Sequence, residues 1–132
     1  MISTNEELEG YLGRLERAYQ RLDDGTYAIS VGAGRPPVAF RLSPPVLVIQ
    51  VVIGAAPRSP ERAAPLFLRL LEFNAERLLH TAYGLEGDTI VLSAALELSS
   101  IDLNELEAVL ADVDVALAEQ VPELRELAQE QA

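Results

Sequence analysis

The fold is decided by residues 59–121, which read SPERAAPLFLRLLEFNAERLLHTAYGLEGDTIVLSAALELSSIDLNELEAVLADVDVALAEQV. Ser59 can cap a helix, Pro60 suits the first helical position, and Glu61 places a negative charge in the first turn. These residues predict a helix that runs to about Leu79. The residues that share one face of this helix are Leu66, Phe67, Leu70, Leu71, Asn74 and Leu78.

Two strands are expected after this helix, over residues 81–85 and 89–98. The link between them, Glu86-Gly87-Asp88, is short and contains a glycine. Such a link between two strand-like runs is typical of a β-hairpin.

A long helix is expected next, starting at Ser100 or Asp102, and Glu105 follows Asp102 by three residues. Pro122 is expected to end or kink this helix, because proline has no N–H to donate. Leu124 and Leu127 predict a short final helical piece. The apolar stripe of the long helix consists of Leu103, Leu106, Val109, Leu110, Val113, Ala116, Leu117 and Val121.

The N-terminal segment also starts with a helix signal. Ser3 or Thr4 can cap the helix, and Glu6 or Glu7 follows at the capping-box spacing. Asp23-Asp24-Gly25 is expected to end it. Apolar residues recur at three- and four-residue steps up to that point, namely Leu8, Tyr11, Leu12, Leu15, Ala18, Tyr19 and Leu22.

Three strands are expected between these two helices, over residues 26–31, 38–42 and 46–53. The second alternates, so that Val38, Phe40 and Leu42 face one way. The third is apolar on both faces and is interrupted only by Gln50, which indicates a strand covered on both faces. One face meets the helices, and the other is expected to meet a second subunit or a client protein.

The order of these elements predicts one α+β domain over residues 1–132. A helix is followed by a three-stranded segment, a second helix, a β-hairpin and a long C-terminal helix. The sheet is expected to be antiparallel, with the helices packed on one side. A length of 132 residues and a hydrophobic content of 49% are sufficient for a packed core.

The charge is unevenly distributed along the chain. The net charge is −11, and residues 97–132 hold ten acids and one base, which gives −9 for this segment. Negative charge repels phosphate, so direct binding to nucleic acid is not expected. The acidic segment is either a solvated helix face or a surface that attracts a basic protein.

The composition also bears on where the protein is located and on which cysteine-dependent sites it can have. The chain has no cysteine, so it has no disulfide framework and no thiolate zinc site. No run of about 18 apolar residues is present, so no membrane span is expected. The first ten residues lack the basic and apolar regions of a secretory signal, so the cytoplasm is expected.

No candidate catalytic or metal-binding motif is complete. His80 is the only histidine, and no orienting carboxylate or further ligand lies near it in sequence, so a structural role is expected. Asn74 either contacts a ligand or, as is more common for such an amide, satisfies buried backbone groups. The acids Asp102, Glu105, Asp112 and Asp114 do not follow the calcium-loop pattern. We therefore expect no enzymatic activity, no cofactor and no metal.

Three segments carry a resemblance to a known family: the helical residues 66–75, the hairpin residues 82–92 and the segment 98–106. Their order resembles that of the small acidic chaperones of type III secretion and the related YbjN-like proteins. In both groups a leucine-leucine-x-x-asparagine helix, here Leu70, Leu71 and Asn74, precedes a hairpin and an acidic helix. The resemblance implies a homodimer without a cofactor or ATP hydrolysis. It also implies a client protein that is held in a partly extended form along the domain.

In the secretion chaperones the client lies against apolar patches and strand edges. For this chain, the resemblance therefore implies client contact on the strands that carry Val38, Phe40, Leu42, Val46, Val48 and Val52. Strand addition gives affinity through main-chain hydrogen bonds and specificity through side-chain pockets. The acidic final helix is the second expected contact surface, with Glu105, Asp112 and Glu119.

The leading hypothesis is a non-enzymatic, dimeric, chaperone-like protein that binds a partner protein. A sharper form holds that the client is basic, for example a nucleic-acid-binding protein attracted to the acidic third of the chain. A second hypothesis is a regulatory or scaffold subunit of a permanent complex. A third is a small enzyme that uses His80 with a carboxylate brought close by the fold.

Overall fold

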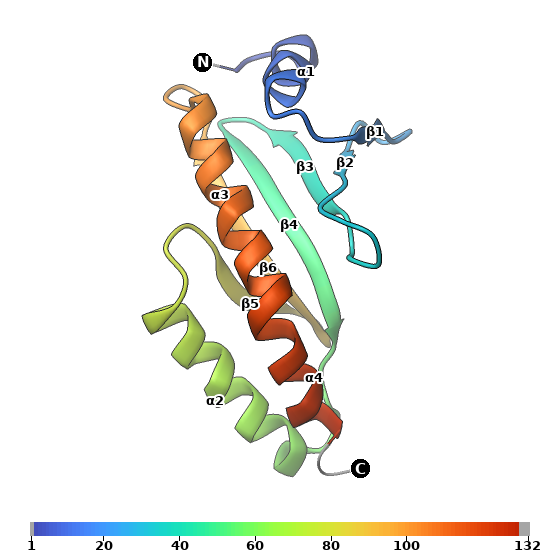
Figure 1. Cartoon of the computed structure of the whole chain (residues 1–132), viewed down its shortest axis with the longest axis vertical. Helices are drawn as coiled ribbons and strands as arrows, with labels where there is room; N and C mark the ends of the chain where they lie inside the picture. The colour runs from blue at the N-terminus through green and yellow to red at the C-terminus, as the bar shows by residue number, and fades with distance from the viewer. Residues whose placement is uncertain (1, 130–132) are drawn as a thin grey trace.

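The computed structural model describes residues 2–129. Six antiparallel strands form one sheet in the spatial order β1-β2-β3-β4-β6-β5 (Figure 1). The two edges of the sheet are therefore β1 and β5, and the predicted hairpin is the β5–β6 pair. The strand bounds are Tyr19–Arg21 for β1, Tyr27–Ile29 for β2, Val38–Ser43 for β3, Val46–Ala55 for β4, Ala82–Glu86 for β5 and Thr89–Glu97 for β6.

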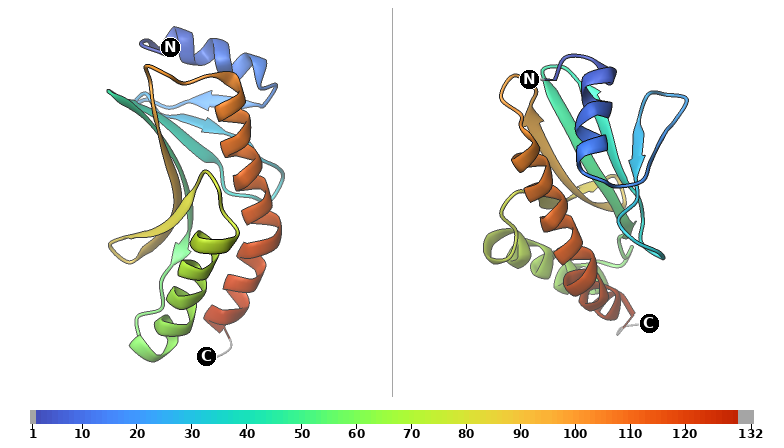
Figure 2. Two further views of the ribbon diagram at one scale, coloured as in Figure 1. Left: turned by 90° about the vertical axis from the view of Figure 1, so that its left-hand side faces the viewer. Right: turned by 45° about the horizontal axis from the view of Figure 1, so that its top comes forward.

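The helices pack on one side of this sheet, as Figure 2 shows. Their bounds are Asn5–Arg14 for α1, Pro60–Glu76 for α2, Leu103–Val115 for α3 and Val121–Gln129 for α4. α3 and α4 run along the sheet as one long rod, and α1 lies near the α3 end of this rod (Figure 1). α2 lies beside β5 and α4. The predicted α+β class, antiparallel sheet and one-sided helices are confirmed.

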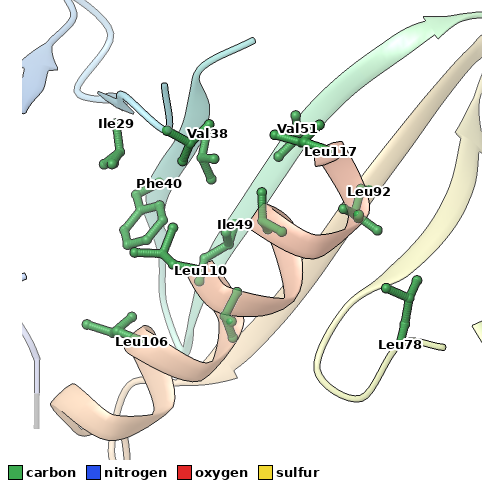
Figure 3. Packing of buried hydrophobic residues seen from close by; sticks show 14 of the residues in the cluster. Ile29, Val38, Phe40, Ile49, Val51, Leu78, Leu92, Leu106, Leu110 and Leu117 are labelled. Atoms are coloured by element: carbon green, nitrogen blue, oxygen red, sulfur yellow. The ribbon is translucent and has the colours of Figure 1, made fainter. Parts of the chain in front are cut away.

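The hydrophobic core lies between the sheet and the helices. Val38, Phe40 and Ile49 from the sheet and Leu106 and Leu110 from α3 are all buried in one cluster (Figure 3). Burial of a side chain of this size stabilises the fold by about 2 kcal/mol.

The two faces of β4 differ in what covers them. On one face the side chains of Val46 and Val48 are half-buried, and that of Val52 is 57% exposed. The helices cover only the other face, so the apolar residues of the first face are left at the surface. The side chains turned towards the helices are fully buried, and they are Leu47, Ile49 and Val51.

The first helix is shorter than the sequence predicts. Its predicted cap is confirmed, since Thr4 Oγ1 accepts a hydrogen bond from Glu7 N–H at 3.2 Å. However, α1 ends at Arg14, and Glu16 has a φ of 56°, a left-handed conformation that interrupts a right-handed helix. Tyr19–Arg21 consequently forms strand β1, although its apolar residues continue the helical spacing.

Pro122 does not end the C-terminal helix. α3 passes into a π-helical turn, Ala116–Gln120, and continues directly as α4. Val121 N–H donates to the carbonyl of Ala116, five residues earlier, so the helix widens just before the proline. The final helical piece predicted from the last leucines is α4.

Candidate partner-binding surfaces

β1 leaves one edge of the sheet open. Ser30 N–H donates to the Ala18 carbonyl at 2.9 Å, which places Ala18 and, two residues later, Gln20 at positions bonded to β2. Hydrogen-bonded positions alternate in an antiparallel pair, so the main-chain groups of Tyr19 and Arg21 point away from β2. All residues of β1 are exposed. An edge of this kind can pair with an added strand.

A shallow groove of about 370 Å³ runs beside this edge. Its lining includes Gln20, Ala28, Ser30 and the side chain of Arg35. Ala28 alternates along β2 with two buried residues, so it lies on the face of the sheet that the helices leave uncovered. A strand added to β1 therefore has a mainly apolar groove for the side chains on that face, in which Gln20, Ser30 and Arg35 are the polar residues.

Side chains tie the β1–β2 hairpin to the helices. The Tyr19 and Tyr27 rings pack edge to face with centroids 5.8 Å apart, and the Tyr27 hydroxyl donates to Glu9 Oε2 of α1 at 3.0 Å. Burial, together with this hydrogen bond to Glu9, raises the pKa of Tyr27. Arg17 Nη2 lies 2.9 Å from Asp114 Oδ2 of α3. These contacts hold the open edge in place.

The structure separates the apolar residues that the sequence analysis assigned to client contact. Val38 and Phe40 are 0% exposed, because the face of β3 that carries them is covered by the helices. Their side chains therefore belong to the core of one chain, which corrects the expectation for these two residues. Leu42 lies on the same covered face and is half-buried. The uncovered face carries Val46, Val48 and Val52.

A cavity of about 480 Å³ opens at the end of this uncovered face. Most of its lining is apolar and includes Ile2, Pro45, Val46 and Leu98, whereas Glu97 is its one charged residue. Ile2 N–H donates to the Leu98 carbonyl at 3.1 Å and thereby holds the N-terminal segment against β6. The cavity has room for an apolar side chain and has a carboxylate beside it.

α2 has a buried face and an exposed apolar stripe. Leu68 is 61% exposed and Leu71 is 65% exposed, and Ala64 and Ala75 are exposed on the same side. Adjacent exposed apolar residues of this size are typical of an interaction surface. The buried face consists of Ala63, Leu66, Leu70 and Phe73.

Asp112 is an acceptor within the chain rather than a client-facing acid. Its Oδ2 accepts from His80 N–H and Thr81 N–H at 3.0 Å each, and from the Thr81 hydroxyl at 2.7 Å. Leu79 N–H also lies 3.3 Å from this oxygen. The carboxylate thus fastens the link between α2 and β5 to α3. The sequence analysis missed this role, because Asp112 and Thr81 are 31 residues apart.

The other two acids assigned to client contact have different surroundings. Glu105 lies in the first turn of α3, half-buried, and its N–H donates to Asp102 Oδ1 at 2.8 Å. Glu119 is exposed in the π-helical turn, where it lines a polar cavity of about 170 Å³ with Arg69 and Arg77. Glu119 is therefore the most accessible of the three carboxylates.

Asn74 reaches from α2 to the edge strand β5. Its Nδ2 donates to the Tyr83 carbonyl at 3.1 Å, and its Oδ1 accepts from Tyr83 N–H at 2.8 Å. The structural interpretation of this amide is thus confirmed. The Tyr83 hydroxyl donates to Gln120 Oε1 at 2.8 Å, and burial raises the pKa of Tyr83 well above its usual value.

His80 contributes its main-chain N–H to the Asp112 cluster, and its side chain is exposed. It lines none of the three cavities described above for residues 2–129. The same part of the chain contains no group of three or more histidine, aspartate and glutamate side chains placed to hold a metal ion. Within it, no helix combines the length and the apolarity that crossing a membrane requires.

Comparison with known proteins finds similarity at the level of family and fold. Residues 1–130 match the model of the CesT_Tir_1 family. No curated protein sequence matches this chain.

Solved structures that are similar to this chain come from several bacteria. A chain of the heterodimeric ExoU–SpcU complex from the type III secretion system of Pseudomonas aeruginosa superposes with a TM-score of 0.67 at 18% identity, covering 93% of this chain and 98% of that one. YbjN from E. coli gives 0.62 at 13% identity, with 91% and 95% covered. The Yersinia pestis secretion chaperone SycH, solved with a YscM2 fragment, gives 0.60 at 17% identity, with 92% and 99% covered. At these identities the likeness shows the fold alone.

Proposed function

The chain belongs to the CesT_Tir_1 family, a type III secretion chaperone family, and we propose that it is a non-enzymatic, chaperone-like protein that binds a partner protein. In this proposal it acts as a single domain, forms a homodimer and works in the cytoplasm. Proteins of the same fold are known in complexes with other proteins, such as SycH with a YscM2 fragment and SchA with HopA1.

The observation that carries the proposal is the open edge at β1. A client segment in extended form takes up the outward N–H and C=O groups of Tyr19 and Arg21 as a seventh strand. Its side chains on the uncovered face lie over the groove that contains Gln20 and Arg35. Main-chain bonds then supply affinity for any extended segment, and the groove selects among segments.

Two apolar regions extend the proposed client surface along the sheet. Val48 and Val52 lie on the uncovered face, and the cavity beside Val46 accepts an apolar side chain at its end. Glu97 at that cavity favours a client that has a basic residue next to the apolar one.

The exposed stripe of α2 supports the homodimer. Burying Leu68 and Leu71 against a second copy removes two large apolar side chains from water, about 2 kcal/mol for each. Leu71→Glu should therefore shift the chain towards a monomer in sedimentation velocity. Gln20→Glu introduces the same charge at an exposed site away from α2 and serves as the control. A wild-type chain that is monomeric throughout would remove this part of the proposal.

The acidic segment supports the sharper form, in which the client is basic. Residues 97–132 carry ten acids and one base. Among these acids, Glu119 is exposed in the π-helical turn between α3 and α4. Attraction between exposed charges is screened at high ionic strength, so binding of a basic client should weaken steeply as salt rises. Binding that is independent of salt would contradict the basic client and leave the apolar client surface in place.

The test compares two substitutions at one edge residue. Arg21→Pro removes an outward N–H that is needed for strand addition, whereas Arg21→Ala removes the side chain and keeps that N–H. Partners captured from native lysate by the wild type and by Arg21→Ala should be lost or weakened about tenfold with Arg21→Pro. Equal capture by both variants would rule out strand addition at β1, and no capture by the wild type would rule out a stable client.

One observation favours a second candidate function, a scaffold or regulatory subunit of a permanent complex. Leu79 is 88% exposed in the link between α2 and β5. A permanent partner that covers Leu79 predicts poor solubility of the chain expressed alone. A well-behaved chain that remains soluble at high concentration would count against this candidate.

A further inference from the structure

The second edge of the sheet, at β5, is closed by side chains of the same chain. We propose that Asn74 and Asp112 substitute for a neighbouring strand and thereby prevent β5 from pairing with β5 of a second copy. This role goes beyond client binding at β1 and does not depend on it.

Asn74 occupies the central outward position of β5. Tyr83 is opposite Leu92 of β6, yet its N–H and C=O both bond to the Asn74 side chain, so these groups point away from β6. A primary amide presents a donor and an acceptor side by side, as the peptide group of an adjacent strand does. The Asn74 side chain therefore makes the two hydrogen bonds that a partner strand would make at this position.

Asp112 closes the neighbouring position. Thr81 precedes Tyr83 by two residues, and its N–H, directed to the same side, donates to Asp112 Oδ2 at 3.0 Å. Leu85 follows Tyr83 by two residues, so its main chain also points outward. Among residues 2–129 no bond from a side chain or a loop reaches the Leu85 main chain. Side chains thus occupy two of the three outward positions.

The strand that these side chains keep from pairing with β5 is β5 of a second copy of the chain. Residues 82–85 of this strand carry no charge, and the strand has neither lysine nor proline, the residues that commonly protect an exposed edge. The outward positions are also self-complementary. In a two-fold antiparallel pair centred on Tyr83, that residue faces its own copy and Thr81 faces Leu85 of the other chain. The backbone pattern and the low charge of β5 suit pairing with itself, and the side chains of Asn74 and Asp112 withhold its Tyr83 and Thr81 groups from a second copy.

Asn74→Ala tests this directly in the full chain without any client. We expect species of about twice the wild-type mass or larger in sedimentation velocity, increasing with concentration. Asn74→Asp is the matched control, because its carboxylate still accepts from Tyr83 N–H and denies that donor to another strand. It should keep the wild-type mass. Circular dichroism establishes that both variants are folded.

A second substitution locates the association. Leu85→Lys in the Asn74→Ala background places a charge on the β5 edge and should restore the wild-type mass. Association that persists in this double variant would place the contact elsewhere and overturn the proposal. A folded Asn74→Ala chain with the wild-type mass at every concentration would overturn it as well. If Asn74→Ala does not fold, Asn74→Ser gives the same test, since its shorter side chain does not reach both Tyr83 groups.

Discussion

The two edges of one sheet are built in opposite ways. At β1 the main chain of Tyr19 and Arg21 faces outward, and no bond from a side chain or a loop reaches these groups within residues 2–129. At β5 the outward groups of Tyr83 are taken by Asn74, and Asp112 takes Thr81 N–H. The same backbone pattern thus forms a binding edge or a boundary, according to whether side chains of a neighbouring helix reach it.

The largest effect is expected from removing the carboxylate at the closed edge. Asp112→Ala leaves the N–H groups of His80 and Thr81 and the Thr81 hydroxyl without their acceptor. We expect a loss of about 3 kcal/mol in the free energy of unfolding, measured by urea denaturation. Asp112→Asn keeps one acceptor oxygen and should lose less than half as much. An Asp112→Ala variant as stable as the wild type would show that these bonds do not hold the closed edge.

Alkaline pH should weaken the fold through Tyr83 of the edge strand β5 and Tyr27 of β2, the strand next to the open edge. Burial raises the pKa of Tyr83, and burial with the Glu9 hydrogen bond raises that of Tyr27, so the folded state favours the neutral phenols. Stability is fully present below the unfolded value of about 10 and falls as pH rises above it, by up to about 1.4 kcal/mol per pH unit for each group. Urea denaturation at a series of alkaline pH values measures this slope, which Tyr83→Phe should reduce. An unchanged slope in that variant would contradict the assignment to Tyr83.

Removing the hydroxyl groups of the same two tyrosines should give a smaller difference in stability. Tyr83→Phe removes a buried bond and leaves Gln120 Oε1 without its donor, so we expect a loss of about 1 kcal/mol at neutral pH. Tyr27→Phe removes a bond to Glu9, which is partly exposed and can bond to water instead, so the loss should be about half as large. Thermal denaturation of the two variants side by side measures the difference. A larger loss for Tyr27→Phe would reverse the contrast.

The smallest effect on stability is expected at the open edge. Arg21→Pro should lower the free energy of unfolding by no more than about 0.5 kcal/mol beyond Arg21→Ala, because both lose the side chain near Glu9 and Tyr27 and the N–H that only proline removes points to solvent. Gln20→Pro is the control, since Gln20 N–H bonds to β2 and its loss should cost about 2 kcal/mol or more. A larger loss for Arg21→Pro than for Gln20→Pro would mean that the alternation of β1 is assigned the wrong way round, and equal losses would contradict the difference between the two positions.

Local patterns predicted most of the fold. The alternation of Val38 and Phe40, the apolar run of β4 and the glycine link of the hairpin each have a period or a turn residue that can be read along the chain. β1 was missed because Tyr19 continues the helical spacing of the residues before it. The left-handed backbone of Glu16, which ends that spacing in the structure, could not be predicted because glutamate rarely adopts this conformation.

The candidate site was less predictable, because it depends on contacts between distant segments. Assigning Asp112 to a client ignored that the fold brings it to Thr81, 31 residues away. Val38 and Phe40 were assigned to client contact because the sequence does not show which face of their strand the helices cover. In the fold the helices cover the face that carries them, so both side chains are buried. Asn74 was recognised as an amide that satisfies backbone groups, but its partner Tyr83 follows only from the packing of α2 on β5.

Amide hydrogen exchange followed residue by residue by NMR tests the difference between the edges most directly. After correction for intrinsic rates, the amides of Thr81 and Tyr83 should exchange about a hundredfold more slowly, or slower still, than those of Tyr19 and Arg21. All four amides point away from the neighbouring strand, but those of Thr81 and Tyr83 are buried and bonded to side chains, whereas Tyr19 and Arg21 are exposed. Equal protection at the two edges, or a Tyr83 amide that exchanges as fast as that of Tyr19, would contradict a sheet with one open and one closed edge.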